Sequence, residues 1–326
     1  MRTRTIGGGD RATPVSAIAL GAMMFGTATD EETSFAILDR FLASGGTFID
    51  TSNNYAYWVN GTRGGESERL LGRWLSDRGL TDEVVVATKV GGRPAQAATA
   101  LADDIEGLSA DVIRRGLDRS LKNLGRDHVD VFYAHVPDPR TPFDEQIRTF
   151  GVLAAEGRAT HIGLSNHWSW QIERARTLAA AEGLPAVQVL QHHHSYLRSR
   201  VDHPSRRSPD GQIGVVSPDL LAYLRDQPGL APVAYSPLLR GAYARDIDPG
   251  ELYRHPGNDA RRIALQEVAA EAGATPNQVV LAWLMGGDVP FIPLIGASSV
   301  GQLDENLAAA DLELTSAQRE RLDGAN

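Results

Sequence analysis

The chain has 326 residues, of which 42% are hydrophobic and 22% are charged, so it can bury a large core and lacks the composition of a disordered protein. Its net charge is −9 and its 32 basic residues are spread along the sequence, which argues against a nucleic-acid-binding surface. The absence of cysteine excludes disulfides, thiolate metal sites and a cysteine nucleophile.

The sequence predicts neither an export signal nor a membrane span. The first ten residues, MRTRTIGGGD, contain no apolar segment of the kind found in signal peptides. No later run approaches the roughly 20 apolar residues of a membrane span. We therefore expect a cytoplasmic protein with no membrane partner.

Short apolar runs alternate with amphipathic helical stretches along nearly the whole chain, which is typical of repeated strand-helix units around a parallel sheet. The predicted strands cover residues 17–21, 47–50, 83–89, 129–135, 159–165, 186–191, 231–236 and 290–296. The predicted helices cover residues 33–45, 66–79, 109–125, 142–157, 170–183, 217–227, 275–287 and 299–310. This alternation predicts a closed (β/α)8 TIM barrel, in one domain over residues 1–326, with an open doubly wound sheet as the alternative.

Some segments fall outside the strand-helix repeat. Residues 1–8 and 12–16 predict an N-terminal β-hairpin that closes the floor of the barrel, and Thr315 to Gly324 predicts a short C-terminal helix. Long connections after several strands predict extended βα loops on the C-terminal face, where barrels build their sites. The substrate would depend on four of these loops, at residues 56–65, 91–108, 137–142 and 196–216.

Polar residues stand where the predicted strands end, and in a barrel all these ends share one rim. They are Asp50 with Tyr55 just beyond it, Lys89, His135, Ser165 with Asn166, Gln191, and Tyr235 with Ser236. Any one of them alone is as well explained by a cap or a solvated side chain. Their occurrence on successive strand ends indicates a catalytic face.

The chemistry of this set follows from its members. A phenol titrates near pH 10, and a neighbouring ammonium such as that of Lys89 favours the phenolate form of Tyr55. Asp50 would keep the ammonium charged and oriented, and His135 could orient a substrate oxygen. Such a set is suited to protonating a carbonyl oxygen while hydride reaches the carbon.

The sequence resembles the aldo-keto reductase family over essentially its whole length. The resemblance is carried by FIDTSNNY, VVVATKV and FYAHVPD around Asp50, Tyr55, Lys89 and His135, and continues in GLSN (163–166), LQ (190–191), AYSPLLRG (234–241) and GASSVGQLDEN (296–306). It implies reduction of an aldehyde or ketone, with Tyr55 as the general acid, Lys89 and Asp50 tuning it, and His135 positioning the carbonyl. Tyr55, Trp58 and His135 would contact the substrate.

The resemblance also implies a nicotinamide cofactor held by residues from several strand ends. Ser165, Asn166 and Gln191 would hold the carboxamide, and Tyr235 would stack on the ring. The full set of implied cofactor residues is Gly21, Met23, Asp50, Ser165, Asn166, Gln191, Tyr235, Ser236, Leu238, Gly241, Gly296, Ser298, Gln302, Glu305 and Asn306.

The residues themselves also favour this cofactor site over a Rossmann site. No strand-turn-helix carries G-x-G-x-x-G, whereas GASS precedes a predicted helix after the last strand, where barrels bind phosphate on backbone N–H groups. Ser298 or Ser299 could also cap that helix, and the two roles are compatible. No Lys or Arg lies between residues 296 and 306, so Arg261 and Arg262 are the candidates for an adenosine 2′-phosphate. NADP(H) is favoured, and NAD(H) is possible.

The run His192, His193 and His194 departs from the family pattern at this point. Alternation along a strand end would put at most two of the three on one side, and no spacing marks a third ligand, so we predict no metal site. A solvated or substrate-lining role fits better.

Two other functions remain as alternatives. Lys89 at a barrel strand end could form a Schiff base in an aldolase-type lyase. Some relatives of the family act as cofactor-sensing subunits of channels, although nothing in this sequence indicates such a partner. The sequence defines neither the particular carbonyl substrate nor the oligomeric state.

Overall fold

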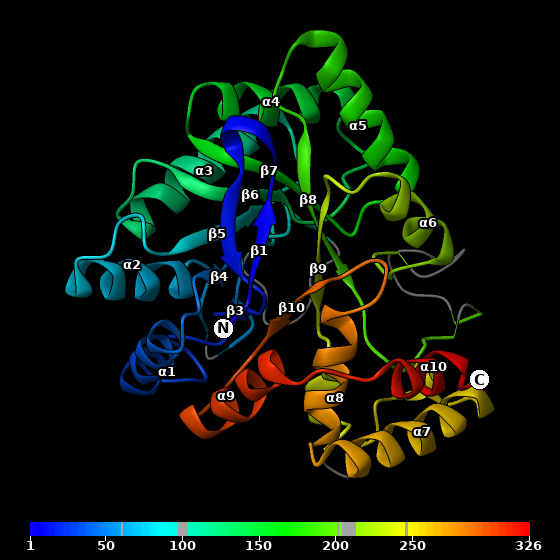
Figure 1. The fold of residues 1–326 in the computed structure, drawn as a ribbon. Helices are drawn as coiled ribbons and strands as arrows, with labels where there is room; N and C mark the ends of the chain where they lie inside the picture. The colour runs from blue at the N-terminus through cyan, green and yellow to red at the C-terminus, as the bar shows by residue number, and fades with distance from the viewer. Residues whose placement is uncertain (60, 97–103, 201, 204–212, 245–246) are drawn as a thin grey trace.

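Parallel strands close into a barrel at the centre of the molecule (Figure 1). The computed structural model describes residues 1–59, 61–96, 104–200, 202–203, 213–244 and 247–326. The strands follow one another around the barrel in the order β10-β3-β4-β5-β6-β7-β8-β9, all in parallel pairing. Their bounds are β3 (Ala19–Gly21), β4 (Phe48–Asp50), β5 (Val85–Val90), β6 (Val129–Ala134), β7 (Ala159–Ser165), β8 (Val187–His193), β9 (Ala231–Tyr235) and β10 (Ile292–Ile295). The predicted (β/α)8 TIM barrel is confirmed.

The N-terminal hairpin closes one end of this barrel. Strands β1 (Thr3–Ile6) and β2 (Thr13–Ser16) pair antiparallel, with Ile6 opposite Thr13. Ile6 and Val15 are buried and belong to the same apolar cluster as inward-facing strand residues such as Phe48 and Val131. The predicted hairpin at the barrel floor is therefore confirmed, and we expect a functional site on the opposite, C-terminal face of the barrel.

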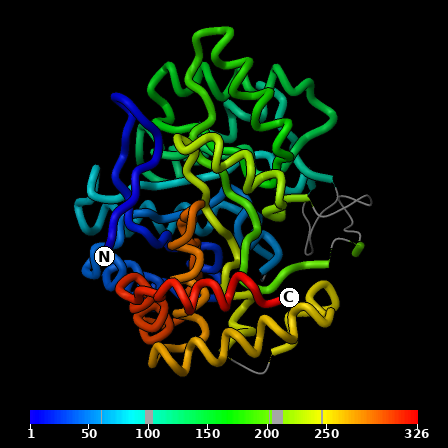
Figure 2. The backbone as a smooth tube through the Cα atoms, turned by 45° about the vertical axis from the view of Figure 1, so that its right-hand side comes forward, coloured from blue at the N-terminus to red at the C-terminus, as the bar shows by residue number. Residues whose placement is uncertain are grey.

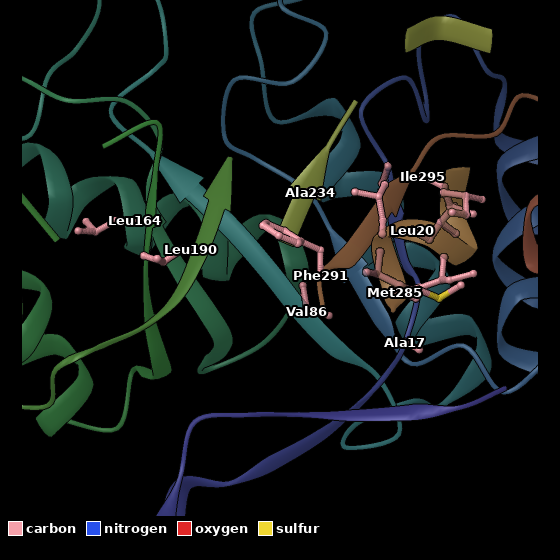
Figure 3. Packing of buried hydrophobic residues seen from close by; sticks show 14 of the residues in the cluster. Ala17, Leu20, Val86, Leu164, Leu190, Ala234, Met285, Phe291 and Ile295 are labelled. Carbon is pink, nitrogen blue, oxygen red and sulfur yellow. The ribbon is translucent and has the colours of Figure 1, made fainter. Parts of the chain in front are cut away.

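Helices form the outer layer, and their bounds agree with the predicted ones to within a few residues in most cases. They are α1 (Glu31–Ala43), α2 (Glu66–Arg78), α3 (Ala110–Leu124), α4 (Phe143–Ala155), α5 (Ser169–Glu182), α6 (Pro218–Asp226), α7 (Pro256–Ala272), α8 (Pro276–Met285), α9 (Val300–Leu307) and α10 (Ser316–Gly324). The outward side chains of successive strands, among them Val86, Leu164, Leu190 and Ile295, pack into the layer between barrel and helices (Figure 3).

Helix α7 was not predicted from the sequence. Its buried face has helical spacing, but two of its positions are the polar residues Asn258 and Arg261, and apolar periodicity begins only at Ala264. Figure 2 shows α7 running beside α10, the C-terminal helix. The prediction of a single helix between the last two barrel strands is thus wrong, because a buried arginine hides the pattern.

In the part of the chain that the structure describes, none of the helices is both long and apolar enough to cross a membrane.

Candidate active site

Asp50, Tyr55 and Lys89 form one hydrogen-bonded cluster at the carboxyl ends of β4 and β5. The Tyr55 hydroxyl donates to Asp50 Oδ1 at 2.9 Å and accepts from Lys89 Nζ at 2.7 Å. Lys89 Nζ also forms an ion pair with Asp50 Oδ1 and donates to the Thr51 carbonyl at 2.8 Å. Asp50 and Lys89 are fully buried, whereas Tyr55 is partly exposed. The three side chains predicted to act together are therefore in direct contact.

The local backbone explains how a strand end and a turn deliver these groups to one place. Asp50 is the last residue of β4, and the turn that follows is tied to the next strand by a bond from Asn53 N to the Lys89 carbonyl at 3.2 Å. The turn brings Tyr55 back over the end of the barrel. Ala56, directly after it, has a φ of 58°, a left-handed conformation that costs a non-glycine residue energy.

The electrostatics of the cluster differ from the simple expectation for a lysine beside a phenol. Burial and the negative charge of Asp50 raise the pKa of Tyr55 well above its ordinary value. Burial lowers the pKa of Lys89, and the ion pair with Asp50 opposes that shift. The prediction that Lys89 favours the phenolate is thus outweighed here by burial and Asp50, and the phenol keeps its proton at neutral pH.

His135 lies beside this cluster, one residue past β6. Its ring stands edge-on to the Tyr55 ring with centroids 6.2 Å apart, and its Nδ1 lies 3.3 Å from Ser52 Oγ. Ser52 in turn donates to Asn54 Oδ1 at 2.7 Å. Ser52 and Asn54 were not predicted from the sequence as site residues. Both belong to the TSNNY turn between Asp50 and Tyr55, and their place in this turn is the signal by which they could have been found.

The residues expected to hold a nicotinamide carboxamide are linked to the cluster and to one another. Gln191 Nε2 donates to Asp50 Oδ2 at 2.8 Å. Asn166 Nδ2 donates to Ser165 Oγ at 3.0 Å and to the His135 carbonyl at 2.9 Å, and the Tyr235 hydroxyl donates to Asn166 Oδ1 at 2.8 Å. The structure therefore brings the ends of β4 to β9 together into one polar rim.

Left-handed backbone conformations gather at this rim. The non-glycine residues with positive φ, within the described ranges, are Ala56, Asn166, Ser236, Leu239 and Arg240. All of them follow the ends of β4, β7 or β9. Such strain is kept where surrounding contacts fix a functional geometry, so its location supports a site on the C-terminal face.

The residues expected to meet the phosphates lie in two exposed stretches. Ser236, Leu238 and Gly241 belong to the turn after β9, where Gly241 has a φ of 88°. Ser299 caps α9 by accepting from Gln302 N at 3.3 Å, and Ser298 donates to Gln302 Oε1 at 2.9 Å, so the capping interpretation of GASS is confirmed. Both serines remain exposed.

The other expected cofactor residues occupy varied environments. Gly21 ends β3, Met23 is 39% exposed in the following turn, and Gly296 is exposed after β10. Glu305 accepts hydrogen bonds from Thr275 at 3.0 Å and from Asn277 at 3.3 Å, which ties α9 to the start of α8. Asn306 is buried. Glu305 therefore helps to hold α9 against α8, independently of any contact with a cofactor.

Arg261 has a structural environment unlike that of a phosphate ligand. It is 2% exposed, its Nε donates to the Tyr196 carbonyl at 2.8 Å and one of its guanidinium nitrogens donates to the Ala325 carbonyl at 2.9 Å. The guanidinium lies 4.2 Å from the centre of the Tyr196 ring. Arg262 is only partly buried and lines a surface cavity of about 320 Å³. Of the two arginines, only Arg262 remains a candidate for contact with a phosphate.

The three consecutive histidines point in different directions. His192 is buried, and its Nε2 lies 2.8 Å from the His167 carbonyl oxygen. His193 packs against Tyr235, and His194 lies against Phe291 with ring centres 4.6 Å apart. No group of three potential metal ligands occurs among the described residues. The three side chains are therefore separated, as the predicted alternation along the strand implies, whereas the expected solvated role is wrong for His192, which is buried.

The loops expected to shape the substrate pocket are only partly covered. Residues 60, 97–103, 201 and 204–212, which belong to three of those loops, lie outside the described residues. Trp58 is partly exposed after the Tyr55 turn, and its ring packs edge-on against Tyr57 with centroids 5.0 Å apart. Trp168, which follows Asn166 past the end of β7, is 40% exposed.

Because two of its histidines are buried, we predict that the protein loses much of its folding stability in mild acid. Burial lowers the pKa of His167 and that of His192 to about 4. Between about pH 6.5 and pH 4 the unfolded chain therefore binds more protons, so stability is fully present above pH 6.5 and falls as the pH drops. The two histidines together should give a slope of roughly 2.7 kcal/mol per pH unit near pH 5.

Urea unfolding at pH 7.5, 6 and 5 measures this dependence. His192→Gln, which keeps a neutral donor, should show a shallower loss of stability with falling pH than the unsubstituted chain. Identical slopes for the two proteins would contradict the assignment.

The fold and the residues at its rim define a class of protein, namely a barrel enzyme with a cluster of ionisable side chains at the carboxyl ends of its strands. The profile of the Aldo/keto reductase family matches residues 17–326. The uncharacterized oxidoreductase YrpG of Bacillus subtilis is 32% identical over 309 residues, which cover 92% of this chain and 89% of that protein. The chain belongs to the aldo/keto reductase family.

Other relatives carry names that describe reductases. Aldo-keto reductase str7 of Strobilurus tenacellus is 28% identical, covering 92% of this chain and 86% of its own. Norsolorinic acid reductase of Aspergillus flavus is 29% identical, covering 95% of this chain and 78% of its own. Together with the family, these relatives support an oxidoreductase that reduces carbonyl groups.

Proposed function

We propose that this protein reduces an aldehyde or ketone to an alcohol with NADP(H), and that Tyr55 is its general acid. The observation that carries the proposal is the Tyr55 hydroxyl, which is hydrogen-bonded to both Asp50 and Lys89 at the open rim of the barrel. A neutral phenol that lies next to an ammonium group can give up its proton and be stabilised afterwards as the phenolate.

The residues at the rim fit a nicotinamide cofactor. Tyr235 presents a ring whose hydroxyl is fixed by Asn166, and the strained turn at Ser236 to Arg240 follows directly. Ser165, Asn166 and Gln191 would hold the carboxamide, while Ser236, Leu238, Gly241, Ser298 and Gln302 would face the phosphates. When bound, this group supplies the hydride.

The protein's own residues supply the proton. In the present arrangement Tyr55 donates to Asp50 Oδ1 and accepts from Lys89 Nζ. To protonate a substrate oxygen, the hydroxyl turns from Asp50 toward that oxygen and keeps the bond from Lys89. His135, edge-on to the Tyr55 ring, would orient the same oxygen, and Trp58 would line the pocket beside it.

Lys89 is poorly placed for the alternative Schiff-base chemistry. All three of its N–H bonds have acceptors, namely Asp50 Oδ1, Thr51 O and Tyr55 Oη. Nucleophilic attack would require breaking this buried arrangement and deprotonating the ammonium group. Borohydride trapping of a carbonyl compound on Lys89 would nevertheless favour the lyase and contradict the reductase.

Titration with NADPH and NADH, followed by fluorescence, tests the proposal. We expect saturable binding of both and tighter binding of NADPH, then oxidation of the preferred cofactor with members of a carbonyl panel. Tighter binding of NADH would reverse the proposed preference. Absence of binding to either would contradict the proposed function as a whole.

A further inference from the structure

His193 and Gly214 belong to a closed ring of contacts around the two residues expected to hold the nicotinamide. The Tyr235 hydroxyl donates to Asn166 Oδ1 at 2.8 Å, and the His193 ring stands edge-on to the Tyr235 ring, with centroids 5.5 Å apart and planes at 82°. His193 N donates to the Gly214 carbonyl at 2.7 Å. Gly214 then returns to Asn166, because a Cβ added to it would lie 2.1 Å from Asn166 Oδ1.

The His193 side chain is held from its other side as well. Its Nε2 lies 3.1 Å from the hydroxyl of Tyr253, in the short helix Glu251–Tyr253. Burial raises the pKa of Tyr253 and lowers the pKa of His193 to about 4, so the phenol keeps its proton and the imidazole is neutral. Tyr253 can therefore donate to Nε2, which fixes the plane of the imidazole against Tyr235.

We propose that His193, held by Tyr253 and Gly214, is a positioning residue that sets the orientation of the Tyr235 ring and thereby the affinity for the nicotinamide cofactor. The inference rests on the proposed function. An edge-to-face contact restricts the rotation of both rings, so the stacking face of Tyr235 is presented before the cofactor arrives.

Gly214 has a separate requirement within the same ring of contacts. Its φ of 80° is in the left-handed region, and a Cβ at this position would require the Asn166 side chain to move. Gly214 lies well beyond the end of β8 in the sequence and carries no sequence signal that would have marked it. Its place against Asn166 arises only from the fold.

The neighbouring histidine provides a matched control. The His194 ring packs against Trp283 and Phe291, with ring centres 5.6 Å and 4.6 Å away, and its backbone N–H donates to the Tyr235 carbonyl at 3.5 Å, a bond that a change of the side chain keeps. A substitution there removes an imidazole from the same run while leaving the ring of contacts in place.

The test measures the dissociation constant of NADPH, or of NADH if it binds more tightly, by fluorescence. His193→Ala should weaken binding roughly three- to tenfold, the value of one aromatic contact, while His194→Ala should change it less than about twofold. Tyr253→Phe should weaken binding in the same direction, by less than His193→Ala. Thermal unfolding of each variant shows whether the fold is kept.

A double substitution separates positioning from general loosening of the structure. If His193 acts through Tyr235, His193→Ala has no further effect on cofactor binding in a Tyr235→Ala background. Equal affinities of His193→Ala and the unsubstituted protein, equal weakening in His193→Ala and His194→Ala, or full additivity with Tyr235→Ala would each overturn the inference. Failure of the unsubstituted protein to bind either cofactor would instead overturn the proposed function.

Discussion

Tyr55→Phe is expected to reduce turnover of an aldehyde or ketone by a factor of roughly 10² to 10⁴, the usual contribution of a general acid. The substitution removes the hydroxyl that links Asp50 to Lys89 and leaves the ring, whose centre lies 4.6 Å from Lys89 Nζ. Because most of the proposed cofactor contacts come from the ends of β7 to β10 and the set does not include Tyr55 itself, the dissociation constant for NADPH should stay within about threefold of the original value.

Steady-state kinetics and fluorescence titration on the same preparations distinguish the two effects. Tyr223→Phe is a matched control, since it removes the hydroxyl of a tyrosine on α6 that donates to Glu173 Oε2 at 2.7 Å, away from the barrel rim. Turnover by Tyr55→Phe at the level of the control would show that another group supplies the proton.

Much of the fold could be predicted from the sequence because its signals are local. Apolar runs bounded by glycine mark the strands, and the residue that ends each run must lie on the common rim of a parallel barrel. That rule alone places Asp50, Lys89 and Gln191 in one site, and the structure joins them through hydrogen bonds of Asp50.

What could not be predicted depends on contacts between distant segments. Arg261 was predicted as a candidate phosphate ligand, yet it is buried and donates hydrogen bonds to the Tyr196 and Ala325 carbonyls, which come from other parts of the chain. Strand geometry predicts that the three histidines alternate in direction, but the partners of their rings come from distant segments, for example Tyr253 for His193 and Phe291 for His194. The direction of the pKa shift of Tyr55 likewise depends on its burial, which no local pattern gives.

Removing one partner of the buried pair Asp50 and Lys89 should destabilise the fold by roughly 3–5 kcal/mol, because it leaves an uncompensated charge in the interior. Asp50 and Lys89 are 1% and 0% exposed. Asp50→Leu leaves the ammonium with only Thr51 O and Tyr55 Oη as acceptors, and Lys89→Met leaves the carboxylate with donors from Tyr55 and Gln191. Each single variant thus leaves a buried charge with two neutral partners, and we expect both to show this loss of stability in urea unfolding.

The double variant, Asp50→Leu with Lys89→Met, should be more stable than Asp50→Leu alone, because no charge is then left buried. The pH dependence of the stability of these variants provides a second, independent test. Burial already lowers the pKa of Lys89, and loss of the opposing Asp50 lowers it further. Since the unfolded lysine titrates near pH 10.4, the stability of Asp50→Leu should rise between pH 7 and pH 9, and that of the double variant should not share this rise. A double variant no more stable than Asp50→Leu, with the same pH dependence, would mean that the Lys89 ammonium group moves into solvent when Asp50 is lost, so that no charge is left buried in the single variant.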